Sequence, residues 1–226
     1  MFKHLDYLNG DDLETTNIDG TRFYKVPSWK WYPSITSVTS FYNRDIFYEW
    51  RKRVGDEKAY KITRESTFRG TKYHDLVEHY LRNEDVNKID NVLPSTKFLF
   101  LSSKANLNRI NNIHALEKSL YSDYFGLAGR VDCIAEYDGE LAVIDFKTST
   151  KIKPEEWIEN YFVQETAYAC MYYEMTGIPV KKLITIMVAE NGECIVYEKR
   201  NKDHYIKLLT RYIKKFVEHK TRDYGN

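Results

Sequence analysis

The sequence predicts an α/β fold in which a mixed β-sheet is flanked by helices. Two β-hairpin patterns support this prediction, because each joins two apolar runs through a turn dipeptide, Asp138-Gly139 in one and Asn191-Gly192 in the other. A long helical segment separates the two hairpins, and helical segments dominate the first half of the chain. Strands and helices in this order are typical of a sheet with helices on its faces.

The expected elements follow one another along the chain. The N-terminal half holds a short hairpin and then four helices, at residues 18–26, 45–53, 56–67, 71–82 and 96–109. The polar stretch 83–91 is interpreted as a loop. The second half holds a strand, a hairpin, a helix, a second hairpin and a final helix, at residues 114–121, 131–137, 141–146, 155–176, 183–189, 193–199 and 202–220. The final helix is amphipathic and is expected to bury Tyr205, Leu208, Leu209, Tyr212 and Phe216.

The stretch GRVDCIAEYDGELAVIDFKTS, residues 129–149, contains the charged side chains of greatest chemical interest. Side chains at i and i+2 of a strand share a face, so Asp145 and Lys147 point the same way and Phe146 points into the core. Asp132 begins the partner strand, and antiparallel pairing brings it close to Asp145. Two acids and one lysine therefore converge at neighbouring strand ends, although such residues also occur there simply as solvated groups.

This set of residues suits metal-assisted cleavage of a phosphodiester bond. Mg²⁺ prefers oxygen ligands, which Asp132 and Asp145 offer as carboxylates and Phe146 offers as a backbone carbonyl. A bound cation stabilises charge on a phosphate and acidifies a water molecule. Lys147 is placed to orient that water or to neutralise negative charge in the transition state.

The helix 155–176 presents one long face with a polar residue in its middle. The residues on that face are Trp157, Tyr161, Gln164, Tyr168, Met171 and Met175. Such a stripe is typical of a core, and we assign Trp157, Met171 and Met175 to the core. Gln164 is either a hydrogen-bonded core glutamine or a site residue, because an amide in a packed face needs partners.

A second helical segment contains a histidine. Residues 69–74 read RGTKYH and are expected to open the helix 71–82, with Thr71 as the N-cap. His74 shares a helix face with Glu78 and Leu81. A single helical histidine is either structural or a metal ligand, and its position alone leaves both interpretations open.

Together these segments resemble the PD-(D/E)XK nuclease superfamily. The resemblance is strongest to its RecB-type exonuclease branch, the mitochondrial genome maintenance exonucleases with their phage and bacterial relatives. The matching pieces are PSITSVTSFY, RGTKYHDLVEHYL, GLAGRVDCIAEYDGELAVIDFKTS and QETAYA, at residues 33–42, 69–81, 126–149 and 164–169. They stand in the family's order and spacing. The chain departs from the superfamily's named pattern at Val131, where the pattern has proline, and at Asp145, which replaces glutamate as a permitted variant.

The resemblance implies a restriction-endonuclease-like core with a helical N-terminal elaboration. Residues 1–226 would form one nuclease domain, with 1–112 as its mostly helical N-terminal part and 113–226 as its catalytic core. The implied catalytic residues are Glu117, Asp132, Asp145, Lys147, Gln164 and Tyr168. The expected metal ligands are His74, Asp132, Asp145 and the carbonyl of Phe146.

The resemblance implies a different role for each of the matched residues. Asp132 and Asp145 would be the metal carboxylates, and Lys147 would be the catalytic lysine. Gln164 and Tyr168 would be the family's Q-x-x-x-Y pair, near the active site and the DNA. Glu117 stands where these nucleases often carry an upstream glutamate.

Composition limits the kinds of partner. The formal net charge of +1 gives no basic footprint over the whole chain, so DNA binding would depend on local patches such as residues 51–53 or Lys151 and Lys153. Aromatic residues make up 15% of the chain, enough for some rings to stack on unpaired bases.

Other sequence features exclude several classes of site and location. The cysteines are Cys133, Cys170 and Cys194, which form no C-x-x-C pair and cannot supply the four ligands of an iron–sulfur cluster. No targeting or membrane-spanning segment is evident in the sequence. We therefore expect no membrane partner, and a location in the cytoplasm of a bacterial or phage-infected cell.

The expected function is that of a Mg²⁺- or Mn²⁺-dependent DNA exonuclease that acts on single strands or frayed ends in replication, recombination or repair. Three alternatives stay open: a structure-specific endonuclease of the same fold, a catalytically decayed DNA-binding module and a metal-binding structural protein. The polarity of digestion and the oligomeric state have no signature in the sequence.

Overall fold

The computed structural model describes residues 1–5, 7–8 and 12–223. Its centre is a five-stranded sheet in the order β4-β5-β6-β7-β8. The strands are β4 (Ile110–Ser122), β5 (Leu127–Tyr137), β6 (Glu140–Ser149), β7 (Lys182–Ala189) and β8 (Cys194–Lys199). Strands β6 and β7 pair in parallel, and the other neighbours in this sheet pair antiparallel. The mixed sheet flanked by helices confirms the predicted fold class.

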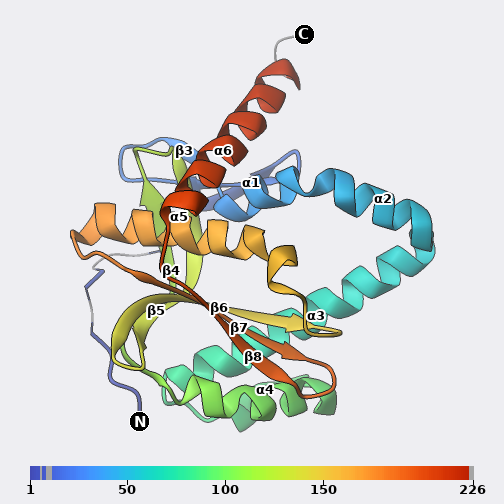
Figure 1. The fold of residues 1–226 in the computed structure, drawn as a ribbon, viewed down its shortest axis with the longest axis vertical. Coiled ribbons are helices and arrows are strands. Elements are labelled where there is room, and N and C mark those ends of the chain that lie inside the picture. The colour runs from blue at the N-terminus through green and yellow to red at the C-terminus, as the bar shows by residue number, and fades with distance from the viewer. Residues whose placement is uncertain (6, 9–11, 224–226) are drawn as a thin grey trace.

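Helices cover both faces of the sheet (Figure 1). Helix α5 (Glu159–Thr176) crosses one face between β6 and β7, because parallel strands need a crossover connection. Helices α1 (Ile35–Tyr42) and α6 (Asp203–Asp223) pack against α5. Helices α3 (Asp56–Leu81) and α4 (Pro94–Leu107) cover the opposite face. Alternate residues along each strand therefore face two separate apolar cores.

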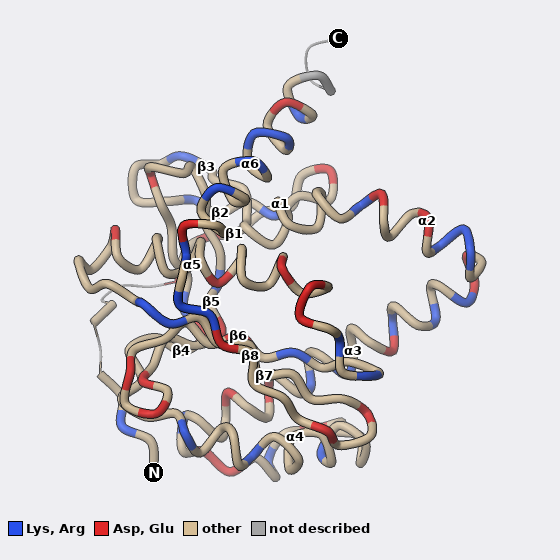
Figure 2. The backbone as a smooth tube through the Cα atoms, viewed as in Figure 1, with Lys and Arg blue, Asp and Glu red and all other residues tan. Residues whose placement is uncertain are grey.

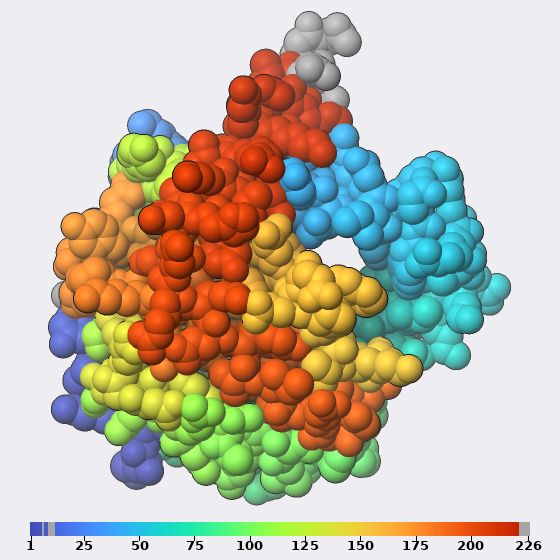
Figure 3. All heavy atoms as spheres, in the orientation of Figure 1, coloured from blue at the N-terminus to red at the C-terminus, as the bar shows by residue number. Residues whose placement is uncertain are grey.

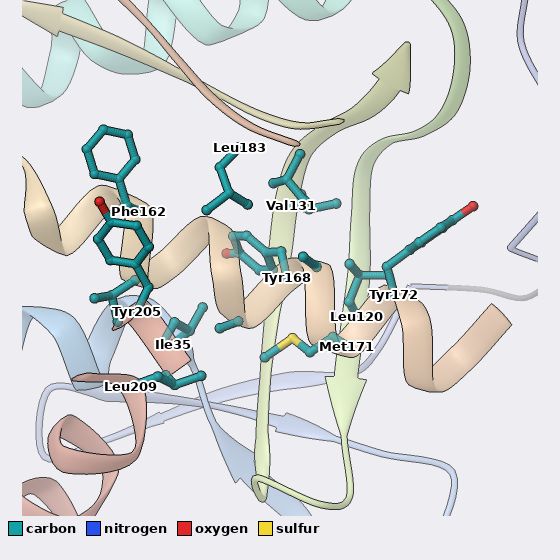
Figure 4. Close-up of a cluster of buried hydrophobic side chains, with 14 of the residues drawn as sticks. Ile35, Leu120, Val131, Phe162, Tyr168, Met171, Tyr172, Leu183, Tyr205 and Leu209 are labelled. Carbon is teal, nitrogen blue, oxygen red and sulfur yellow. The ribbon is translucent and has the colours of Figure 1, made fainter. Parts of the chain in front are cut away.

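The core on the α5 side joins distant parts of the chain (Figure 4). Tyr168 and Met171 of α5 pack with Val131 of β5, with Ile35 of α1 and with Leu209 of α6. The opposite core includes the fully buried side chains Tyr73, Leu76 and Phe100 from α3 and α4, together with Phe146 of β6. The burial of Phe146 confirms that it points away from the face shared by Asp145 and Lys147.

A small three-stranded sheet precedes the helices. It consists of β1 (Thr15–Ile18), β2 (Thr21–Lys25) and β3 (Trp31–Pro33). The first two strands form the hairpin that was predicted at residues 18–26, whereas β3 was not predicted. Helix α1 was missed as well, because its sequence ITSVTSFY is rich in β-branched and hydroxyl residues that disfavour helices. Ser34 accepts a hydrogen bond from the N–H of Ser37, which caps the start of α1.

The predicted division into helices 56–67 and 71–82 was wrong, and so was the N-cap at Thr71. Helix α3 runs unbroken from Asp56 to Leu81, and its boundary with α2 (Arg44–Val54) falls at Gly55. Gly70 lies inside α3, with Thr148 Oγ1 of β6 4.0 Å from the position that a Cβ would occupy. Packing against β6 therefore keeps the helix continuous where propensity alone indicates a break.

The assignment of Trp157 to the core was also wrong. A short 3₁₀ turn, η2 (Glu155–Trp157), precedes α5, so Trp157 lies outside the helical register used for the prediction and its side chain is 71% exposed. The assignment of Met175 to the core was wrong too, because Met175 is 36% exposed near the end of α5, whereas Met171 is buried as predicted. The predicted loop 83–91 contains one 3₁₀ turn, η1 (Val86–Lys88).

The remaining elements agree with the sequence in kind and differ in length. Strands β4 and β5 both extend well beyond the predicted segments 114–121 and 131–137. The hairpin turn between β5 and β6 falls at Asp138-Gly139, where both residues have the positive φ that such a turn requires. All five side chains expected in the core from the final helix are buried. Within the described part of the chain, no helix has the length and apolarity needed to span a membrane.

A buried carboxylic acid lies between α5 and the sheet. Glu165 is 0% exposed, and its Oε1 accepts a hydrogen bond from the hydroxyl of Thr185 on β7. Among the described residues, Glu165 Oε2 has no hydrogen-bond partner. Burial, followed by the charge of Asp145, raises the pKa of Glu165 well above 4.5. The folded protein therefore holds a proton on Glu165 that the unfolded chain releases at neutral pH.

Replacing Glu165 by glutamine should raise the thermal stability of the metal-free protein, and the gain should grow with pH. Unfolding of the wild-type protein releases the proton of Glu165 above pH 4.5, so rising pH favours the unfolded state, whereas Glu165→Gln has no proton to release. Melting curves in EDTA between about pH 5 and about pH 8 measure the difference. The exposed Glu156→Gln is the matched control, and a Glu165→Gln gain that did not change with pH would contradict the assigned protonation.

Candidate active site

Three side chains from three elements come together at one edge of the sheet. Nδ1 of His74 on α3 lies 3.9 Å from a Glu117 carboxylate oxygen and 3.7 Å from Asp132 Oδ2. One potential ligand atom from each residue lies within 4.8 Å of the other two. One imidazole and two carboxylates at this spacing are able to hold a divalent cation between them.

The β5–β6 hairpin brings Asp132 and Asp145 together as the sequence predicts. The strand pairing ends with Cys133 opposite Ile144, so Asp132 and Asp145 occupy the next position across the two strands. Asp132 Oδ2 accepts a hydrogen bond of 3.0 Å from the backbone N–H of Phe146. This bond fixes the Asp132 carboxylate beside β6 just beyond the point where the two strands stop pairing, and both acids lie within their strands, not at the strand ends that the sequence predicted. The same bond satisfies the hydrogen-bonding capacity of the Phe146 N–H group. The carbonyl of Phe146 remains a predicted metal ligand.

Glu117 reaches the site through an unusual backbone conformation. Its φ is 50°, in the left-handed region that non-glycine residues rarely adopt. The preceding residue, Leu116, packs into the core beneath α3, and Glu117 also faces α3 through His74. Two successive residues of β4 therefore face the same layer, which a regular strand forbids. Strain of this kind at the edge of an acidic cluster is typical of a functional site.

Asp145, Lys147 and Gln164 form the α5 side of the site. Asp145 is only 3% exposed, and its carboxylate pairs with the ammonium group of Lys147. The side-chain amide of Gln164 donates a hydrogen bond of 3.3 Å to the other oxygen of Asp145. The structure therefore places Gln164 in the site and gives its amide the partner that a packed face demands.

The charges in this cluster shift one another's protonation. Burial alone lowers the pKa of His74, but the charge of Asp132 and the hydrogen bond to Glu117 outweigh burial and raise that pKa to about 9. Burial raises the pKa of Asp145 to about 6, with Lys147 lowering it and Asp132 raising it further. Without a cation, His74 is therefore protonated at neutral pH and supplies positive charge between the two carboxylates.

Tyr168 lies next to the backbone that leads into Asp132. It is buried, and its hydroxyl donates a hydrogen bond of 2.7 Å to the carbonyl of Arg130 on β5. A Cβ on Gly129 would lie 2.9 Å from the Tyr168 ring, so glycine is needed for this close approach. Tyr168 thus holds the backbone just before Asp132, and burial, together with the charges of Asp132, Asp145 and Glu117, raises the pKa of the Tyr168 hydroxyl well above its usual value.

Sequence reasoning missed Glu165, which follows Gln164 directly. Its partner Thr185 is paired with Asp145 across β6 and β7, so Glu165 lies immediately behind a candidate metal ligand. The available signal was an acidic residue inside the apolar run FVQETAYA, where a charge can be buried only beside partners.

Comparisons with known proteins agree with this geometry. A stretch of 145 residues is 29% identical to the human (Homo sapiens) protein "Mitochondrial genome maintenance exonuclease 1", covering 59% of this chain and 39% of that protein. The Xenopus tropicalis protein of the same name is 31% identical over 130 residues, covering 54% of this chain and 37% of its own length. The chain thus spans less than two fifths of these relatives.

A solved structure shows a weaker likeness. The crystal structure of a putative exonuclease from Eubacterium rectale has a TM-score of 0.42 and 11% identity, covering 68% of this chain and 65% of that one. The model of a single protein family matches residues 46–222, which is well over half of the chain and includes every candidate site residue. The chain therefore belongs to the PD-(D/E)XK nuclease superfamily.

Proposed function

We propose that this protein is a divalent-metal-dependent deoxyribonuclease that digests single-stranded DNA from an end. The observation that carries the proposal is the convergence of His74 with Glu117, Asp132, Asp145 and Lys147 of the adjacent strands β4, β5 and β6 in a member of this nuclease superfamily. Each group has a place in phosphodiester hydrolysis, and ligand atoms of His74, Glu117 and Asp132 lie within 4.8 Å of one another, a spacing that suits a cation.

The residues present fit Mg²⁺ or Mn²⁺. The donor set is carboxylate oxygen with one imidazole, and Asp145 adds a buried carboxylate whose Oδ2 is paired with the ammonium group of Lys147. His74, Asp132 and Asp145 would hold the ion, with Glu117 and the Phe146 carbonyl beside it. When bound, the ion would supply positive charge for the phosphate and acidity for a ligated water.

The protein's own groups would orient the reaction. Lys147 is partly exposed beside Asp145, so its ammonium group can approach a phosphate oxygen and offset the negative charge that builds up during cleavage. Gln164 fixes the rotamer of Asp145 through its amide hydrogen bond. Tyr168 acts indirectly, because it fixes the β5 backbone next to Asp132.

An opening beside the site favours a single strand as the substrate. Figure 3 shows this opening passing through the molecule, bordered by α1, α2, the first half of α3 and the segment after β6. We call residues 44–70, which span α2 and the first part of α3, the arch. Helix α1 packs on α5 and helix α3 packs on β6, so contacts within the fold close the border of the opening.

The chemistry of the arch suits an unpaired nucleic acid. It has eight Lys and Arg against five Asp and Glu, a net charge of +3 in a chain whose total is +1 (Figure 2). Its exposed aromatic side chains are Phe47, Tyr48, Tyr60 and Phe68. None of the residues Arg44–Val54, all within the described chain, is buried. Local positive charge attracts phosphates, and exposed rings stack on bases that are not paired.

A closed opening also favours an exonuclease over an endonuclease. A strand enters a closed opening only by its end, so a substrate without ends cannot thread through it. The exposed ring of Trp157 belongs to the segment after β6, which borders the opening, and offers a further stacking surface. A role in replication, recombination or repair within a bacterial or phage-infected cell is the setting that we propose for this activity.

Asp145→Asn should abolish activity and preserve the fold. The substitution removes a carboxylate ligand without changing the shape of the side chain, so we expect a loss of at least about 100-fold in turnover. The measurement is Mg²⁺-dependent hydrolysis of end-labelled single-stranded DNA, with circular dichroism to confirm folding. Asp90→Asn, at an exposed position, is the matched control. Undiminished hydrolysis by Asp145→Asn would remove the basis of the active-site assignment.

Cation binding should strengthen as pH rises. With a pKa of about 9, His74 holds a proton at neutral pH that a metal ion must displace, and Asp145, with a pKa of about 6, holds one in acid. Affinity for Mn²⁺ in the absence of DNA should therefore increase from about pH 6 to about pH 9, with release of protons. Calorimetry in two buffers of different ionisation enthalpy measures that release. Affinity independent of pH would argue against His74 as a ligand.

A covalently closed circle of single-stranded DNA should resist digestion. Linear DNA of the same sequence should be degraded from its ends, because the strand has to enter the opening by a terminus. Gel analysis of both substrates, with the circle later linearised in the same tube as a control, makes the comparison. Cleavage of the circle at the rate of the linear strand would favour the endonuclease alternative.

A further inference from the structure

Two ammonium groups share one aromatic ring at the edge of the candidate site. The ring belongs to Tyr161 of α5, and Lys147 Nζ lies 5.2 Å and Lys153 Nζ 5.5 Å from its centroid. Lys153 Nζ also donates a hydrogen bond of 3.0 Å to Tyr161 Oη. Both contacts are favourable, because a ring attracts a cation and a hydroxyl oxygen accepts from one. Tyr161 therefore sets the position of Lys153 relative to Lys147.

The backbone that carries Lys153 is anchored as well. The hydroxyl of Tyr197 on β8 donates a hydrogen bond of 2.5 Å to the Lys153 carbonyl. Glu155, two residues further along, pairs with Lys199 of β8. The segment after β6 is thus tied to the sheet at two points while it borders the opening (Figure 3). A lysine on an anchored segment loses little further freedom when it binds a ligand.

The charge of Lys153 is not neutralised within the described protein. Lys147 has Asp145 as its acidic partner, whereas no described carboxylate lies within 4.0 Å of Lys153 Nζ. Two cations held close to one another repel, and a single acid balances only one of them. The site therefore retains a positive charge close to Lys147, on the segment that borders the opening, and an anion would bind favourably beside it.

The same observations separate two lysines that the sequence treats alike. Lys151 is exposed and makes no hydrogen bond or ion pair within the described chain. Lys153 is partly buried and is fixed by Tyr161. A cation that is held in place binds a phosphate at a defined position, whereas a mobile cation contributes only to the electrostatic potential around the protein.

We propose that Lys153, held by the positioning residue Tyr161, binds the DNA backbone phosphate adjacent to the one that is cleaved. The identity of the anion rests on the proposed function, because a DNA strand is the polyanion that would lie in the opening. Lys147 then contacts the phosphate that is cleaved, and Lys153 contacts the adjacent phosphate. The tyrosine between them sets the spacing of the two cations.

The test separates the charge of Lys153 from its position. Lys153→Met removes the charge, Lys153→Arg retains it, and Tyr161→Phe keeps the ring but removes the hydroxyl that holds Lys153. Lys181→Met is the matched control, because it deletes an exposed lysine just before β7, toward the far end of the strand pair from Lys147. Binding of fluorescent single-stranded DNA in EDTA is measured over a range of salt concentrations, followed by steady-state kinetics with Mg²⁺.

We expect Lys153→Met to reduce the slope of log affinity against log salt by about 0.7, as loss of one phosphate contact to a single strand requires. Its KM should rise about fivefold with kcat unchanged, because the contact is the same in the ground and transition states. Lys153→Arg should keep the salt slope and KM close to their wild-type values, because the positive charge is retained. Tyr161→Phe should weaken binding about threefold with the slope unchanged, because the charge is still present but is no longer held in place.

Three results would contradict the proposal. A Lys153→Met variant that matches Lys181→Met in slope and KM, or that lowers kcat at constant KM, excludes a phosphate contact of this kind. A Tyr161→Phe variant that binds DNA as tightly as the wild-type protein refutes the positioning role of Tyr161. The binding measurements need no hydrolysis, so they stand even if the wild-type protein cuts no DNA. In that case the nuclease proposal fails while the phosphate contact survives.

Discussion

The concentration of acidic groups around the point where β5 and β6 stop pairing is the constraint on which the site depends. Asp132, Asp145 and Glu165 lie close together, and the last two are almost completely removed from solvent. Three negative charges at this depth would repel one another strongly. The protein avoids that state in three ways: Lys147 pairs with Asp145, Glu165 keeps a proton, and His74 takes one up. A divalent cation would take over the balancing role of the proton on His74.

This constraint explains why the site is built from several elements. Carboxylates that lie close together need a positive charge nearby, but a strand places only every second side chain on the face that holds them. Lys147 comes from the same strand as Asp145, two residues along, whereas His74 must come from a helix on the opposite face. The site therefore forms only where α3, the β5–β6 hairpin and α5 meet at one edge of the sheet.

The parts of the site that sequence could predict are those fixed by local geometry. The i, i+2 spacing puts Asp145 and Lys147 on one face, and the Asp138-Gly139 turn sets the register that brings Asp132 across. Glu117 was placed by resemblance alone, because its direction depends on a left-handed residue that no strand pattern predicts. Glu165 was missed because its position depends on how α5 packs over β7.

The fold shows the same division between local and tertiary control. The hairpins and the amphipathic final helix follow from turn residues and periodicity, and the sequence predicted them. Helix α1 forms against its propensity because Ile35 and Val38 are completely buried under α5 and α6, a contact that exists only in the folded state. Trp157 fits the apolar periodicity of α5 but precedes that helix, so its ring faces solvent.

The continuity of α3 links the substrate path to the chemistry. Had the helix begun at Thr71, the arch and His74 would have belonged to separate bodies joined by a flexible Gly70. One unbroken helix instead contains both the arch residues 56–70 and the metal-ligand candidate His74. Arg69 pairs with Glu190 at the point where α3 leaves the sheet, which holds this junction in place. A displacement of the arch would therefore be transmitted along one rigid helix to His74 and would change its position relative to Asp132.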